Sequence, residues 1–290
     1  MKGIILAAGR GTRLYPMTKP VCKPLLPIYD KPLIYYPLAM LIQAGIRQVL
    51  LIVPPGETPA FESLLGDGSQ LGMEISYAVQ PRPRGIADAL LIGRTFVGED
   101  SVCLVLGDNL FYAPDFQQTM HAAARNNRGA TVFGYYVADP RPFGVVEFDR
   151  DWNVLSLEEK PREPKSNYVV PGVYFYDHQV MEIAAGLTPS ARGELEITDV
   201  NRAYLAKKQL KVVPLDRSTR WKDAGTADSL LDAGQTVREL QTQTGLLIGC
   251  IEELAYDQGW ITAEALYALG EKLACTYYGR HMMAYSQLVK

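Results

Sequence analysis

The sequence has few of the residues that disulfide scaffolds, zinc sites and histidine-based catalysis require. It contains four cysteines and three histidines in 290 residues, with no C-x-x-C pair and no cysteine and histidine at metal-ligand spacing. No hydrophobic run approaches the roughly 18–20 residues of a membrane helix, and the N-terminal apolar stretch is too short for a secretion signal. Twenty-nine basic and thirty-two acidic residues give a net charge of −3, unlike a basic nucleic-acid binder. These absences predict a reduced, cytoplasmic protein that binds neither membranes nor nucleic acid.

The sequence does contain enough apolar residues for a large core, 48% of the chain. In its first half, short β-rich runs alternate with segments of helical periodicity, a pattern typical of α/β domains with parallel strands. Strands are expected at residues 3–7, 48–53, 74–79, 102–106 and 130–137. Helices are expected at 32–43, from 58, at 86–96 and at 115–126.

After about residue 139 the pattern changes to short strands joined by proline-rich loops. Strands are expected at 145–148, 154–157, 173–176 and 210–214, and helices at 179–185, 196–206 and from 226 to about 241. The first three of these strands predict an antiparallel lobe on the same sheet. Residues 251–290 are predicted to be mostly helical, with an apolar stripe that packs on the core or on a second subunit.

A glycine-rich loop, Gly9-Arg10-Gly11-Thr12-Arg13, follows the first expected strand. Backbone N–H groups in such a turn can bind phosphate, and glycine allows the ligand to approach closely. The loop lacks the Gly-Lys-Ser/Thr of a P-loop, and Leu14 replaces the third glycine of a dinucleotide-binding loop. Arg13 and Lys23 would supply positive charge to a polyphosphate. A simple turn between strand and helix is the alternative.

Two aspartates are candidate metal ligands. Asp108 follows the buried strand at 102–106, and Asp223 is expected in a loop just before the helix at 226. Mg²⁺ is usually held by one or two carboxylates, with phosphate and water as the other ligands. A capping role for Asp223 is the alternative.

Charged residues in the second half form a candidate site for a phosphorylated sugar. Glu159 can accept from hydroxyl groups while Lys160 meets a phosphate, and Arg192 adds a second cation. A solvated charge run is the alternative. The three histidines are scattered over helical segments, and no Ser/His/Asp or Cys/His set can be assembled. Hydrolysis through a covalent intermediate is therefore disfavoured.

Together these segments resemble the glucose-1-phosphate thymidylyltransferases of the short bacterial type, a family of sugar-phosphate nucleotidyltransferases. The segments concerned are 9–13, 23–32, 64–68, 106–109, 156–161 and 192–199, and the resemblance extends over nearly the whole chain. It implies an α/β fold with a Rossmann-like mixed sheet flanked by helices and a sugar-side antiparallel lobe. The catalytic domain would span 1–250, with a nucleotide half at 1–138 and a sugar-phosphate half at 139–250, and 251–290 would form a helical subunit interface.

The resemblance also implies an activity and its residues. A homotetramer would condense dTTP with glucose 1-phosphate to dTDP-glucose and pyrophosphate for biosynthesis of the dTDP-rhamnose type, with a dTDP-sugar as feedback inhibitor at a subunit interface. The nucleotide would contact Leu6, Ala8, Gly9, Gly11, Thr12, Arg13, Lys23, Gln80, Gly85 and Asp108, of which Arg13 and Lys23 are catalytic. The sugar phosphate would contact Asn109, Gly144, Glu159, Lys160, Val170 and Arg192. Mg²⁺ would bind Asp108 and Asp223.

The chain departs from the family pattern beside these positions. Family members commonly read Pro-Asp-Gly-Leu-Ala-Gln where residues 83–88 read Pro-Arg-Gly-Ile-Ala-Asp, and Val-Thr-Gly where 170–172 read Val-Pro-Gly. Because Arg84 and Asp88 are four residues apart at the start of an expected helix, we predict that they form an ion pair. A solvated Arg84 is the alternative. For the whole chain, the alternatives are the same reaction with UTP or another sugar 1-phosphate, and a non-catalytic nucleotide-sugar sensor.

Overall fold

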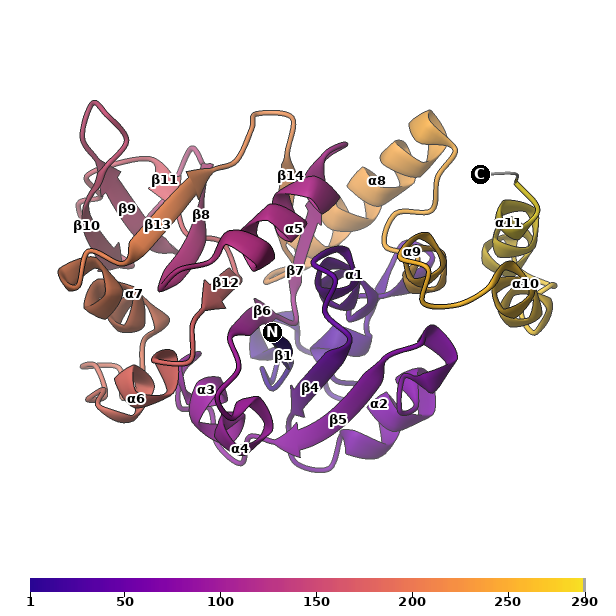
Figure 1. The fold of residues 1–290 in the computed structure, drawn as a ribbon, viewed down its shortest axis with the longest axis horizontal. Coiled ribbons are helices and arrows are strands. Elements are labelled where there is room, and N and C mark those ends of the chain that lie inside the picture. The colour runs from indigo at the N-terminus through magenta and orange to yellow at the C-terminus, as the bar shows by residue number, and fades with distance from the viewer. Residues whose placement is uncertain (289–290) are drawn as a thin grey trace.

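The computed structural model describes residues 1–288 and is built on one ten-stranded mixed sheet (Figure 1). One side of this sheet is parallel, in the order β6-β1-β4-β5. Its strands are β1 (Lys2–Leu6), β4 (Gln48–Val53), β5 (Glu74–Val79) and β6 (Val102–Leu106). The last three have the bounds expected from the sequence. β6 is a continuous apolar run, as expected of a strand covered on both faces, whereas β5 contains Glu74 and Ser76 and is mostly only partly buried.

The other side of the sheet is the expected antiparallel lobe. β12 (Val173–Tyr176) joins the two sides, since it pairs antiparallel with both β6 and β8 (Ala130–Tyr136). Beyond β8 lie β9 (Gly144–Phe148), β10 (Val154–Glu159) and β11 (Tyr168–Val169). β13 (Leu210–Pro214) differs, because it runs parallel to β8. The predicted mixed sheet with an antiparallel lobe is confirmed.

Helices cover both faces of the sheet, so that neighbouring strand residues enter different cores. Ile5 belongs to the cluster that contains α1 (Tyr35–Gln43) and α5 (Phe116–Asn126). Ile4 belongs to the opposite cluster. The helices of that second face are α3 (Asp88–Ile92), α6 (Val180–Ala185) and α7 (Ile197–Ala206). α2 (Thr58–Leu65) packs beside β5.

Two expected helices differ from those observed. α1 begins at Tyr35 rather than at residue 32, because β3 (Lys31–Pro32) pairs with β2 (Pro27–Ile28). The helix expected at 86–96 is divided into α3 and α4 (Arg94–Val97) at Gly93. A Cβ on Gly93 would lie 2.5 Å from Ile4 Cδ1, so close packing against the sheet favours glycine there.

Five of the described strands were not expected from the sequence, namely β2, β3, β11 and two that bear on the site. β7 (Asn109–Tyr112) and β14 (Arg220–Asp223) form an antiparallel pair in which Asp223 stands opposite Asn109. The expectation that Asp223 lies in a loop is therefore wrong, since it is the last residue of a strand. The ladder joins segments far apart in the sequence, so neither segment shows it locally.

The last part of the chain is helical, as expected. α8 (Ala227–Thr244) begins with a capping box in which the Thr226 side chain accepts from Ser229 N–H. It is followed by α9 (Ile251–Asp257), α10 (Ala263–Glu271) and α11 (Tyr277–Ser286). α10 and α11 pack together at the opposite end of the molecule from β9 and β10 (Figure 1). Among the described helices, none is long and apolar enough to cross a membrane.

Candidate functional site

A cavity of about 590 Å³ lies beside the carboxyl end of β6, where the two sides of the sheet meet. Ligands commonly bind outside the carboxyl ends of parallel strands in such sheets. The wall includes residues from both halves of the chain, from Arg13 to Asp223. The predicted site residues that line it are Arg13, Asp108, Asn109, Gly144, Glu159, Lys160, Val170 and Asp223.

Asp108 is held at the wall of this cavity by two contacts. Lys23 Nζ lies 2.6 Å from Asp108 Oδ2, and Asn109 Nδ2 donates to Asp108 Oδ1 over 2.8 Å. Only 6% of Lys23 is exposed, so its ammonium depends on this carboxylate for compensation of its charge. The structure therefore brings together the predicted polyphosphate cation and the predicted metal ligand.

Asp223 reaches the same place from β14. Ala224 N–H donates to the Asp108 carbonyl oxygen over 3.1 Å, and the β7–β14 register places Asp223 beside that contact. Burial, reinforced by the negative charge of Asp108, raises the pKa of Asp223 to about 6, although Lys23 and Arg13 oppose the shift. Its Oδ1 atom is buried and has no hydrogen-bond partner among residues 1–288. Two carboxylates in this arrangement fit a divalent cation.

No cluster of three or more acidic, histidine or cysteine side chains suited to a metal exists among residues 1–288. Asp108 and Asp223 would therefore leave most positions around a cation to phosphate and water oxygens. This donor set suits Mg²⁺, which retains water ligands and is commonly bound through one or two carboxylates and substrate phosphates.

The glycine-rich loop packs against Lys23. Gly11 has a φ of +61°, and a Cβ there would lie 3.0 Å from Lys23 Cβ. Thr18 Oγ1 donates to Gly11 O over 2.6 Å and closes the turn. Arg13 extends from this loop toward the end of β14, where a Cβ on Gly225 would lie 3.0 Å from Arg13 Nη2. The predicted residues of this region that do not line the cavity are Leu6, Ala8, Gly9, Gly11, Thr12 and Lys23.

Gln80 and Gly85 lie together after β5, beside the cavity rather than in its wall. Gln80 Nε2 donates to Asp88 Oδ2 over 2.9 Å. The predicted ion pair of Arg84 and Asp88 is confirmed, with Arg84 Nη1 3.5 Å from Asp88 Oδ1. Ile86, the residue after Gly85, does line the cavity.

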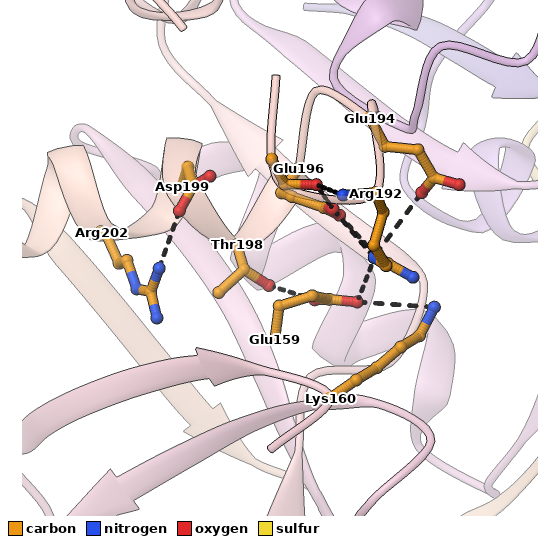
Figure 2. Close-up of polar contacts among 9 residues, drawn as sticks. Glu159, Lys160, Arg192, Glu194, Glu196, Thr198, Asp199 and Arg202 are labelled. Carbon is orange, nitrogen blue, oxygen red and sulfur yellow. Dashed lines mark hydrogen bonds and ion pairs between the residues drawn. The ribbon is translucent and has the colours of Figure 1, made fainter. Parts of the chain in front are cut away.

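Glu159 is the centre of a charged network on the side of the cavity formed by the second half of the chain. It accepts from Thr198 Oγ1 over 2.6 Å and lies 3.7 Å from Lys160 Nζ and 3.5 Å from Arg192 Nη2 (Figure 2). A Cβ on Gly144 would lie 3.3 Å from Glu159 Oε2, so glycine leaves room for the carboxylate.

Arg192 does not line the cavity, but it is held against this network. Its Nη2 atom lies 2.8 Å from Glu196 Oε2 and 3.5 Å from Glu194 Oε2 (Figure 2). The glutamates therefore orient the guanidinium toward Glu159. From the sequence alone, both glutamates could equally have been residues that merely favour a helix N-terminus.

Several residues of the cavity do not stand out in the sequence. Trp221 Nε1 donates to Asn109 Oδ1 over 2.6 Å, and its ring packs edge-on against Phe143 at 5.1 Å. Tyr174 lines the cavity from β12, and burial, together with the charges of Glu159 and Asp108, raises its pKa. The sequence of β12 does not single out Tyr174, because the same buried strand contains a second tyrosine, Tyr176.

Comparison with known proteins agrees with this geometry. The sequence profile of the family described as nucleotidyl transferase matches residues 2–239. The chain is 52% identical to a glucose-1-phosphate thymidylyltransferase of Neisseria gonorrhoeae over 98% of both chains. It is 53% identical to one of Xanthomonas campestris pv. campestris, over 98% of this chain and 96% of that protein.

Solved structures share the fold. A structure from Bacillus anthracis, assigned as a glucose-1-phosphate thymidylyltransferase and determined with sucrose, is 40% identical, with a TM-score of 0.75 over 82% of this chain and 96% of that chain. A UDP-glucose pyrophosphorylase in complex with UDP-glucose is 24% identical, with a TM-score of 0.72 over 82% and 98%, and shares the fold alone. The chain therefore belongs to the glucose-1-phosphate thymidylyltransferase family of nucleotidyltransferase enzymes.

Proposed function

We propose that this enzyme transfers the thymidylyl group of dTTP to glucose 1-phosphate, releasing pyrophosphate and forming dTDP-glucose. The observation that carries the proposal is the cavity in which Arg13 and the Lys23-paired Asp108 face the charged network of Glu159. Polyphosphate and sugar phosphate need separate cationic surfaces, and this cavity has one on each side. The names of the relatives support thymidine and glucose as the partners of the reaction.

Asp108 and Asp223 would hold a Mg²⁺ ion, as the raised pKa of Asp223 and its buried oxygen, which has no hydrogen-bond partner among residues 1–288, favour. When bound, the ion supplies positive charge to phosphoryl oxygens. Lys23 and Arg13 bind the triphosphate and stabilise the pyrophosphate leaving group. We assign the rest of the nucleotide site to Leu6, Ala8, Gly9, Gly11, Thr12, Gln80 and Gly85.

On the other side, Glu159 would accept from sugar hydroxyl groups while Lys160 and Arg192 attract the phosphate. We assign Asn109, Gly144 and Val170 to the same subsite. A phosphate monoester has its second pKa at about 6 and is therefore anionic near pH 7, so its oxygen can attack without a general base. The protein then acts by orienting the two phosphates in line and by compensating their charge.

The biological setting follows from the same proposal. We propose that the product supplies dTDP-sugar biosynthesis in the cytoplasm, that α9–α11 contribute to a homotetramer, and that a dTDP-sugar regulates the enzyme. The test of the tetramer is light scattering during size-exclusion chromatography.

Pyrophosphate release from a panel of nucleoside triphosphates and sugar 1-phosphates tests the reaction itself. We expect the highest kcat/KM with dTTP and glucose 1-phosphate. UTP differs from dTTP at the base by one methyl group, worth about 1–3 kcal/mol, so a higher rate with UTP would reassign the substrate but keep the chemistry. If no pair released pyrophosphate, the proposed reaction would be wrong and a sensor role would replace it.

A further inference from the structure

We propose that Asp88 is a positioning residue that fixes the direction of the Gln80 amide, so that the enzyme selects nucleotides whose base carries a ring N–H. Thymine and uracil have this N–H, whereas cytosine has an acceptor nitrogen at the same place. The inference rests on the proposed function, which places Gln80 at the base. Its new element is Asp88, which stands where the family pattern commonly has glutamine.

The contact between the two side chains is short and nearly inaccessible to solvent. Gln80 is 6% exposed and Asp88 is 4% exposed. Gln80 Nε2 lies 2.9 Å from Asp88 Oδ2 and 3.5 Å from Gly85 O, so both of its hydrogens have acceptors. The amide nitrogen is therefore occupied within the protein.

The chemistry of Asp88 allows only one orientation of this amide. An ionised carboxylate accepts hydrogen bonds and donates none. If the Gln80 amide were reversed, its carbonyl oxygen would face the Asp88 carboxylate in a buried place, where an unmatched polar contact is costly. Without Asp88, only the long contact of 3.5 Å with the Gly85 carbonyl would oppose a reversed amide.

The oxygen of Gln80 is the group left for a ligand. No residue among 1–288 donates a hydrogen bond to Gln80 Oε1, and that atom is not fully buried. The small accessible surface of Gln80 therefore includes this acceptor. An acceptor pairs with the ring N–H of thymine or uracil and opposes the lone pair of cytosine.

Asp88 is itself held in place from two directions. Arg84 Nη1 lies 3.5 Å from Asp88 Oδ1, and this cation partly balances the buried carboxylate. The backbone of the same loop is fixed on Leu195, whose N–H donates to Arg84 O over 2.7 Å and whose carbonyl accepts from Ala87 N–H over 3.1 Å. The Gln80 amide is thus oriented by a carboxylate that is itself fixed by Arg84 and by the contacts of its loop with Leu195.

The test is calorimetric titration of the unaltered enzyme with dTTP, UTP and dCTP in the absence of sugar phosphate, followed by the same titrations with Asp88→Asn. Asparagine can donate as well as accept, so it no longer fixes the amide. We expect the dTTP-to-dCTP affinity ratio to fall by about tenfold or more. The dTTP-to-UTP ratio should not change, because both bases carry the ring N–H.

A double-mutant cycle separates positioning from general damage. In a Gln80→Leu enzyme, Asp88→Asn should leave the dTTP-to-dCTP ratio unaltered, because the amide through which Asp88 acts is gone. Asp100→Asn is the matched control, since it neutralises an exposed aspartate that contacts Lys2, away from the cavity. Circular dichroism checks folding, and Asp88→Ala replaces Asp88→Asn if the latter does not fold.

Each outcome decides the matter. Three results would overturn the role of Asp88 and leave the proposed reaction standing. The dTTP-to-dCTP affinity ratio could be unchanged in Asp88→Asn, or it could change equally in the Gln80→Leu background. The unaltered enzyme could also bind dTTP and dCTP equally. Failure of the unaltered enzyme to bind any of the three nucleotides would overturn both.

Discussion

The residue with the most consequential contact beside the cavity is Lys23. Its ammonium is nearly buried and lies 2.6 Å from Asp108, so its charge is fixed next to a carboxylate of the cavity wall rather than being shared with solvent. In the proposed reaction, a cation in this position would stabilise charge that grows as pyrophosphate departs, which is the kind of interaction that raises kcat.

Replacing Lys23 with alanine should therefore lower kcat/KM for pyrophosphate release by about 100-fold or more. Binding of the product dTDP-glucose should weaken less, because the product lacks the leaving pyrophosphate. Steady-state kinetics and calorimetry measure the two quantities. Normal turnover of Lys23→Ala would show that the Lys23–Asp108 pair is only structural.

Asp223 is a residue whose proposed metal-binding role reduces the stability of the folded protein. Its carboxyl pKa is raised in the folded protein from 3.8 to about 6, so the ionised form is less stable there than in the unfolded chain. The folded state therefore binds more protons between these two values, and stability falls as the pH rises through that interval.

We accordingly predict that Asp223→Asn is more stable than the unaltered protein at pH 7 in the presence of a chelator, by as much as about 3 kcal/mol. The difference should shrink as the pH falls from 6 to 4, while catalytic turnover should be largely lost at every pH. Thermal unfolding across this range measures the first effect. A stability gain independent of pH would show that the charge of the buried carboxylate is not its cause.

At the scale of elements, the site depends on pairings that link distant segments. The strands β4, β5 and β6 could be predicted with their bounds because each is a short β-rich run between loops. The β7–β14 ladder could not, since its two strands are short and each becomes recognisable only opposite the other. The break between α3 and α4 was missed for a similar reason, because the close approach of Gly93 to Ile4 on β1 is a contact between distant segments.

The contact of the loop between β5 and α3 with Leu195 provides a prediction for nucleotide binding and stability. Gly85 has a φ of +100°, and a Cβ there would lie 2.4 Å from Leu195 O. Gly85→Ala should displace the loop from Leu195, raise KM for the nucleotide and reduce the free energy of unfolding by about 1–3 kcal/mol.

Gly56→Ala is the matched control for this change. Gly56 also has a positive φ, +85°, but apart from its two chain neighbours no residue among 1–288 has an atom within 4 Å of the position that a Cβ would take there. It should show only the cost of the left-handed backbone, about 1–2 kcal/mol, with unchanged nucleotide KM. If the two variants had equal effects on KM, the contact with Leu195 would not support the site.

For the whole molecule, the mixed sheet explains why the site forms where it does. β12 joins the parallel side to the antiparallel side, and the cavity lies where the carboxyl end of β6 meets residues of the second half. The charged residues of both halves could be predicted from the sequence by their chemical types and by the family resemblance. Their mutual contacts, and the roles of Trp221 and Thr198 beside them, depend on how the halves fold together.

The central claim is that this cavity joins a nucleotide to a sugar phosphate at Asp108. Phosphorus-31 NMR of the enzyme with dTTP, glucose 1-phosphate and Mg²⁺ tests it most directly, with Asp108→Asn measured in parallel. We predict that dTDP-glucose and pyrophosphate appear in equal amounts with the unaltered enzyme, and that folded Asp108→Asn loses most of this turnover. Equal rates for the two proteins, or no dTDP-glucose from either, would contradict the claim.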